Sequence, residues 1–133
     1  MSESGKTRAA RSICSVAFAG GIAAIAAASA NAAGDAAHGQ QLYTARCIAC
    51  HSLDENRVGP KHRGVYGRKA GRAESYDYSP ALRQTTIVWN DTTLDRWLAD
   101  PEKLIPGQKM GYQVPEAADR EDLIAFLKRE SAQ

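Results

Sequence analysis

The chain has 133 residues, of which 44% are hydrophobic and 24% are charged, and its formal net charge is +2. This length allows one domain, and the composition is that of an ordinary globular protein. The whole charge excess lies in residues 1–32, so the remainder is formally neutral and has no general electrostatic attraction for nucleic acid.

The N-terminal segment has the pattern of a secretory signal peptide. Basic residues precede an apolar run over 13–28, and Ala30-Asn31-Ala32 fits the small-x-small cleavage pattern, with 28–30 as the alternative. An uncleaved membrane anchor is the weaker alternative, because the run is alanine-rich, short and interrupted by two glycines. Its arginines are not adjacent, which favours the general export route over the twin-arginine route. We therefore expect a cleavable signal peptide at 1–32 and one domain at 33–133 that is not an integral membrane protein.

The first helix is expected to begin after Asp35, a favourable N-cap residue, and to run towards Cys47. Cys47-Ile48-Ala49-Cys50-His51 then has the Cys-x-x-Cys-His spacing of a c-type haem attachment site. Positions three and four apart share one face of a helix, so two thiols can reach the haem vinyl groups while the imidazole reaches the iron. A local disulfide or half of a zinc site are the alternatives for this cysteine pair. Cys14, the third cysteine, leaves with the signal peptide.

Long irregular segments and short helices are expected to alternate in the middle of the chain. Residues 52–78 show no helical or alternating period and contain several glycines, which indicates a long loop. Ser79-Pro80 predicts the cap and first turn of a short helix through Leu82. Asn90 or Asp91 is expected to cap a further helix that ends before Pro101.

The end of the chain combines an irregular segment at 104–115, rich in proline and glycine, with a C-terminal helix. The apolar stripe of that helix is Leu123, Ile124, Phe126 and Leu127. No strand pattern appears, so we expect an all-α chain with two long loops. Such a chain has little core of its own. A buried haem would contribute on the order of 10 kcal/mol at ~25 cal/mol per Å² of buried area.

The second iron ligand has few candidates. Met110 is the only methionine after signal removal, and it lies among loop-forming and polar residues, so a simple role as a core filler is less favoured. His38 and His62 are the competitors. His38 is expected at the surface of the first helix, and His62 at the surface or near the haem edge.

Several motifs, in order along the chain, resemble those of the class I cytochromes c, the group that holds mitochondrial cytochrome c and bacterial cytochromes of the c2 type. Besides Cys47–His51, they are Val-Gly-Pro at 58–60, Gly-Val-Tyr-Gly-Arg-Lys-Ala-Gly at 64–71, Tyr-Ser-Pro-Ala at 78–81, Ile-Pro-Gly-Gln-Lys-Met at 105–110 and Arg-Glu-Asp-Leu-Ile-Ala-Phe-Leu at 120–127. The resemblance covers residues 39–127. It implies the class I cytochrome c fold, with three to five short helices and long loops wrapped around one covalently attached haem c.

The resemblance also implies roles for individual residues. Cys47 and Cys50 match the thioether positions, His51 matches the proximal iron ligand and Met110 the distal one. The carbonyl of Pro60 matches the acceptor that orients the proximal imidazole. Residues at positions that bind or shield the haem propionates are Arg68, Tyr78 and Trp89. Residues at the crossing of the terminal helices are Gly39, Tyr43, Leu123 and Phe126.

Three residues depart from the family pattern. His62 stands where a leucine usually packs near the haem, which makes this wall of the pocket more polar. Gln108 replaces a threonine that often bonds a propionate, and Trp97 replaces a common pocket tyrosine. The loop between His51 and Val58 is also shorter than in mitochondrial members.

With protein ligands on both sides of the iron, the function implied is one-electron transfer by a periplasmic carrier, not enzymatic catalysis. Partners would be donor and acceptor redox proteins of a respiratory chain, docking briefly over the haem edge near the thioethers. A run of basic residues opposed by acid-rich segments could steer them; the run is Arg57, Lys61, Arg63, Arg68, Lys69 and Arg72. We expect a monomer. The alternatives are a haem protein with an open sixth site, binding gases or reacting with peroxide, and a subunit of a periplasmic enzyme complex.

Overall fold

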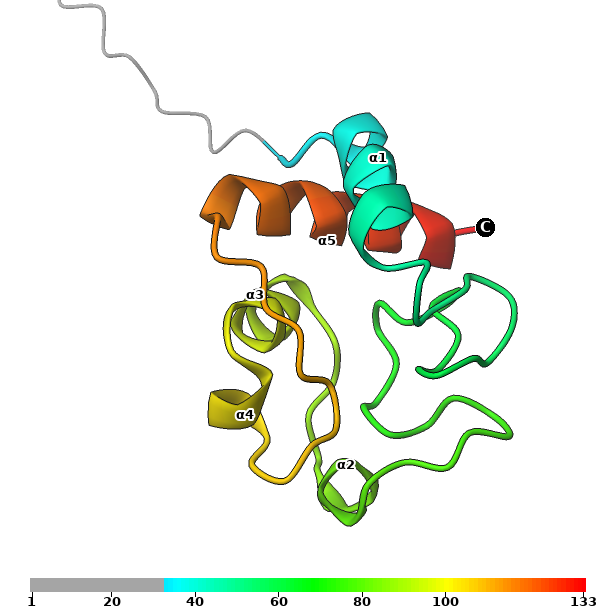
Figure 1. Cartoon of the computed structure of the whole chain (residues 1–133). Coiled ribbons are helices and arrows are strands. Elements are labelled where there is room, and N and C mark those ends of the chain that lie inside the picture. The colour runs from blue at the N-terminus through cyan, green and yellow to red at the C-terminus, as the bar shows by residue number, and fades with distance from the viewer. Residues whose placement is uncertain (1–32) are drawn as a thin grey trace, which may run out of the picture. The chain divides into compact units, whose positions relative to one another are not determined.

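The computed structural model describes residues 33–133, so the expected signal peptide at 1–32 lies outside the described residues. The helices are α1 (Ala36–Arg46), α2 (Pro80–Gln84), α3 (Asp91–Ala99), α4 (Pro101–Leu104) and α5 (Ala117–Ser131), as Figure 1 shows. In this part of the chain the extended pairing is limited to an isolated bridge between Lys69 and Val88. The predicted all-α fold of short helices and long loops is confirmed.

Three helices begin at the caps that the sequence predicts. The Asp35 carboxylate accepts from the amides of Ala37 and His38 at 2.8 and 3.2 Å. Ser79 Oγ accepts from the Leu82 amide at 3.3 Å. Asn90 resolves the choice left open for α3, because its side chain and that of Thr93 each accept from the other's backbone amide at 2.9 Å. Each cap satisfies amides that have no partner inside the helix.

Pro101 does not simply end a helix; it is the first residue of α4, a four-residue helix that the sequence analysis missed. Asp100 caps it by accepting from the Lys103 amide at 3.1 Å. An aspartate followed by proline is the same start signal as Ser79-Pro80. Four residues are too few to show a helical period, so only this dipeptide could have revealed α4.

The terminal helices α1 and α5 cross in close contact. A Cβ atom on Gly39 would lie 1.9 Å from the carbonyl oxygen of Asp122, so the backbones meet where only glycine fits. The Tyr43 and Phe126 rings pack beside this crossing, with centroids 5.0 Å apart. Leu123 is 1% exposed. These are the four residues that the sequence assigns to the crossing.

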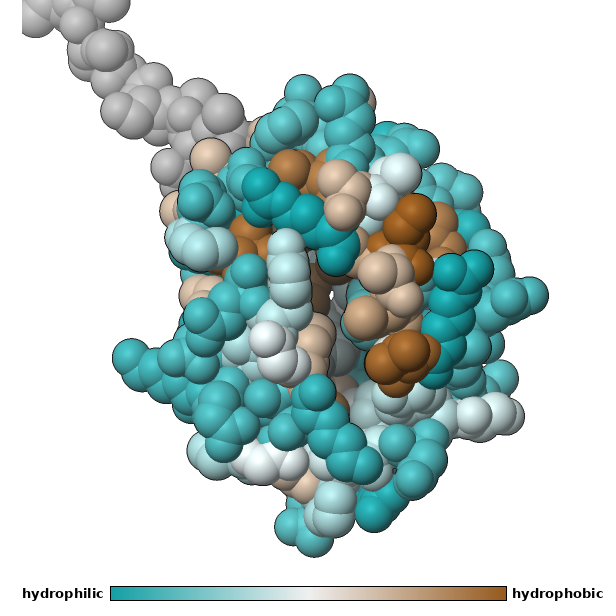
Figure 2. Space-filling model, viewed as in Figure 1, coloured by the Kyte–Doolittle hydropathy of each residue, from teal (hydrophilic) through white to brown (hydrophobic). Residues whose placement is uncertain are grey.

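The remaining chain forms two walls below the crossing. Figure 1 shows the loop at 52–78, in green, facing the segment at 105–115, in yellow and orange. Figure 2 shows a narrow hollow in the face between them, bordered by apolar side chains. Cys47 and Met110 both pack against the hydrophobic core that the helices and walls share. Within residues 33–133, no helix is long and apolar enough to cross a membrane.

Candidate functional site

The His51 ring, just after α1, is held by a backbone carbonyl. His51 Nδ1 lies 2.8 Å from the carbonyl oxygen of Pro60. A carbonyl can only accept, so Nδ1 carries the proton and Nε2 of the neutral ring keeps its lone pair. Burial lowers the pKa of His51, against the opposing effect of the Pro60 carbonyl, which favours this neutral form. The contact predicted for Pro60 is therefore present, and it leaves the ring in the form that binds a metal.

Two further neighbours fix the position of this ring. The backbone of Gly59 lies against it so closely that a Cβ atom there would be 2.1 Å from His51 Cε1. The His62 ring stacks on His51, with centroids 4.0 Å apart and planes inclined by 20°. Tyr43 Oη in turn lies 3.2 Å from His62 Nδ1. His62 therefore belongs to the site itself, as its place at the family's leucine position near the haem implies, and is not a surface residue.

Cys47 and Cys50 are both free thiols, so the pair does not form the alternative disulfide. Burial raises the pKa of the Cys47 thiol to about 11, whereas Cys50 is exposed. No group of three or more His, Cys, Asp or Glu side chains placed to hold a metal ion occurs in residues 33–133. Two free thiols beside a neutral imidazole fit covalent attachment of a haem.

Met110 is partly buried and packs against the hydrophobic core from the second wall. Its backbone amide donates to the side-chain oxygen of Gln108. The same segment is tied to α4, because Glu102 accepts from the Gly107 amide at 2.9 Å and from Gln108 Nε2 at 3.1 Å. Gln108 thus has a local structural role in place of the family's threonine.

The three residues expected at the propionates have internal partners in this structure. The Arg68 guanidinium donates to the carbonyls of Arg63 and Lys61, each at 3.1 Å. Tyr78 is buried and its hydroxyl accepts from the Ala73 amide at 3.2 Å. Trp89 is buried against Trp97, with ring centroids 5.3 Å apart.

His38, the other competitor for the second ligand, lies on the exposed surface of α1. Its Nδ1 is 2.7 Å from the Asp122 carboxylate on α5. The hydrogen bond to Asp122 raises the pKa of His38, as expected for an imidazolium beside a carboxylate. The predicted surface position of His38 is confirmed, and its contact with Asp122 across the two helices is a further finding.

Comparison with known proteins gives a consistent result. The sequence model of the cytochrome c family matches residues 36–130. Cytochrome c of Gibberella zeae is 45% identical over 101 residues, covering 73% of this chain and 95% of that protein. Cytochrome c of Arabidopsis thaliana is 42% identical over 102 residues, covering 74% and 91% respectively.

Among solved structures, cytochrome cH from Methylobacterium extorquens superposes with a TM-score of 0.69 at 42% identity, covering 72% of this chain and 99% of that one. The expected fold and the expected cofactor, one covalently attached haem c, are confirmed by these matches. The chain belongs to the cytochrome c family.

Proposed function

We propose that this protein is an exported, periplasmic one-electron carrier that holds its haem iron between His51 and Met110. Family membership supports electron transfer as the general role. The observation that carries the specific proposal is the His51 ring, whose Nδ1 lies 2.8 Å from the Pro60 carbonyl oxygen. The one methionine of residues 33–133, Met110, lies on the segment at 105–115 that faces the loop at 52–78 (Figure 1). When bound, the haem supplies the exchange of a single electron.

Four residues of the chain would attach the haem, orient its histidine ligand and supply the second ligand. Cys47 and Cys50 attach the cofactor, and Pro60 keeps the His51 proton on Nδ1, so that Nε2 stays available as a ligand. Met110 supplies a soft thioether sulfur, which favours ferrous iron and raises the reduction potential. If His51 and Met110 both hold the iron, small substrates would be kept from it. This is why we favour a carrier over an open haem site.

The surface beside the attachment motif is suited to brief docking of a redox partner protein. Ile48 and Val58 are 44% and 76% exposed there. Arg57 precedes Val58 in the sequence, and its guanidinium donates to the Ile48 carbonyl at 3.2 Å, so a positive charge lies beside both apolar residues. Exposed apolar side chains beside a positive charge give a small contact that can form and separate quickly.

The opposing acid-rich segments contribute less to steering than their composition suggests. Several of their carboxylates are paired within the protein, including Asp95 with Arg120 at 2.6 Å and Asp119 with Arg46 at 2.9 Å. Arg63 of the basic run is likewise paired with Asp54 and Glu130. For steering a partner, the local charge of Arg57 therefore matters more than an overall separation of basic and acidic segments.

The test is a spectrum of the purified protein, made from the full chain in a Gram-negative host that matures c-type cytochromes. We expect one haem that stays attached under denaturing conditions, and a mature N-terminus at Ala33 by mass spectrometry. The oxidised protein should show the weak charge-transfer band of methionine bound to ferric iron. Met110→Ala should abolish this band, whereas the neighbouring exposed change Lys109→Ala should keep it. A wild-type protein without the band would not have Met110 as its sixth ligand, and the proposal would fail.

A further inference from the structure

The His62 side chain makes polar contacts beside His51 that an apolar packing residue at this position would not make. Its ring lies on the proposed proximal ligand, with centroids 4.0 Å apart, and its Nδ1 lies 3.2 Å from Tyr43 Oη. Tyr43 is 4% exposed, so this hydroxyl sits inside the protein. A polar aromatic ring thus stands between Tyr43 of α1 and His51.

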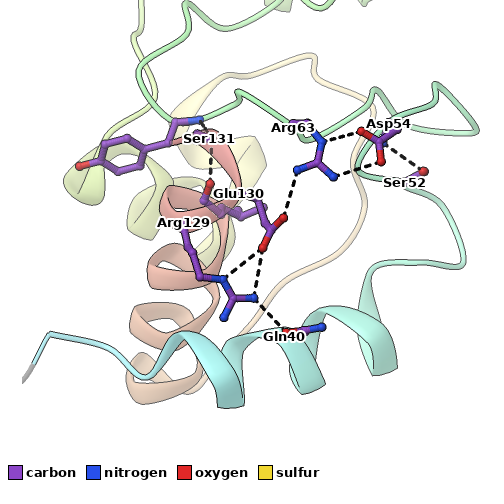
Figure 3. A network of polar contacts seen from close by, with 9 residues as sticks. Gln40, Ser52, Asp54, Arg63, Arg129, Glu130 and Ser131 are labelled. Atoms are coloured by element: carbon purple, nitrogen blue, oxygen red, sulfur yellow. Dashed lines mark hydrogen bonds and ion pairs between the residues drawn. The ribbon is translucent and has the colours of Figure 1, made fainter. Parts of the chain in front are cut away.

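The backbone that carries His62 is firmly anchored. The His62 amide donates to the carbonyl of Ser52 at 2.9 Å. Figure 3 shows the next side chain, Arg63, between two carboxylates: Asp54 at 2.5 Å and Glu130 of α5 at 3.1 Å. Glu130 is 7% exposed, so the second contact is a sheltered one. These contacts fix the backbone at His62 independently of the stacking of its ring on His51.

We propose that His62 is a positioning residue for the proximal ligand: its ring fixes the plane of the His51 imidazole, and its polarity stabilises the ferric state of the bound haem. The inference rests on the proposed electron-carrier function and deepens it. Apolar surroundings disfavour the more highly charged ferric state and raise the reduction potential. A polar ring in contact with the ligand acts in the opposite direction, so this protein has a lower potential than it would have with leucine at position 62.

The first test is the reduction potential of His62→Leu, with His38→Leu as the matched control. His38 undergoes the same chemical change at an exposed site on α1. At a fixed ambient potential, we expect the ratio of reduced to oxidised haem to rise about threefold or more in His62→Leu. At 59 mV per tenfold change for one electron, this is roughly 28 mV upward. His38→Leu should keep the wild-type ratio.

His62→Gln retains a polar side chain and tests whether polarity is the cause. Its potential should lie closer to the wild-type value than to that of His62→Leu. A glutamine variant that shifts as far as the leucine variant would overturn the assignment. So would a leucine variant with the wild-type potential.

The second test concerns the ring plane and uses proton NMR of the oxidised protein. The hyperfine-shifted haem methyl resonances depend on the orientation of the axial imidazole. We expect their pattern to change in His62→Leu and in Tyr43→Phe, which removes the hydroxyl contact, and to stay unchanged in His38→Leu. Unchanged patterns in both variants would refute the positioning role.

These outcomes are separable from a failure of the proposed function. If the wild-type protein lacks attached haem or the methionine charge-transfer band, the electron-carrier proposal itself fails. If those features are present and His62→Leu keeps the wild-type potential and methyl resonances, only the role of His62 fails. Should His62→Leu not fold, the smaller apolar variant His62→Ala takes its place in the comparison of potentials, and Tyr43→Phe still tests the ring plane.

Discussion

Gly39→Ala is the substitution for which helix propensity and packing predict opposite signs. Alanine is favoured over glycine inside a helix by about 1 kcal/mol, so propensity alone predicts a more stable α1. In the structure, the new Cβ would lie 1.9 Å from the Asp122 carbonyl oxygen, and real Cβ contacts essentially never fall below 3.0 Å. The helices would have to separate by about 1 Å, in a core that is packed like a crystal.

Overpacking a core typically costs about 1–3 kcal/mol, and an obstacle made of backbone belongs at the upper end or beyond. After the propensity gain is subtracted, we expect Gly39→Ala to lower the free energy of unfolding by about 2 kcal/mol. The assay is urea unfolding of the oxidised protein, followed by far-ultraviolet circular dichroism. Thr44→Ala on the exposed side of α1 gains propensity without the clash and should stay within about 0.5 kcal/mol of wild type or be slightly more stable. A Gly39→Ala protein as stable as wild type would refute the reasoning.

Three further predictions concern single contacts. Gly59→Ala places a Cβ atom 2.1 Å from His51 Cε1, so the imidazole ring must move. The visible spectrum of the oxidised haem protein should therefore change, and an unaltered spectrum would contradict the prediction. The bond to Asp122 raises the pKa of His38, so its stabilising effect is complete below about pH 6.5 and is lost as the pH rises through the raised folded-state pKa. The stability difference between wild type and His38→Ala in urea should therefore be larger at about pH 5.5 than at about pH 9, and a pH-independent difference would exclude this linkage. Glu130→Ala removes a sheltered carboxylate that pairs with Arg63 and Arg129, two side chains that water still reaches. We expect it to lower the free energy of unfolding in urea by about 1–2 kcal/mol. No measurable loss would show that the two ion pairs contribute nothing to stability.

Much of the fold follows from short-range signals in the sequence. Asp35, Ser79 and Asn90 cap their helices because each side chain bonds amides two or three residues away, and such contacts are readable from spacing alone. The same local chemistry at Asp100-Pro101 starts α4, but its four residues leave no periodicity to draw attention to it. The prediction failed there because the helix is shorter than the pattern that identifies helices.

The candidate site divides in the same way. Cys47, Cys50 and His51 are neighbours in sequence, so their spacing predicts their joint role, and Met110 follows because no other methionine remains after signal removal. The stacking of His62 on His51 cannot be predicted in this way. Ten residues of irregular loop separate the two histidines, and the approach of their rings depends on how that loop folds back.

That folding back depends on the crossing of the terminal helices. α1 contributes Tyr43, whose hydroxyl meets His62, and α5 contributes Glu130, which holds Arg63 beside it. Both helices can approach the loop together because Gly39 lets their backbones touch. The helix crossing and the wall beside His51 therefore form one packing unit. The glycine that lets α1 and α5 touch therefore also contributes to where the polar ring lies against His51.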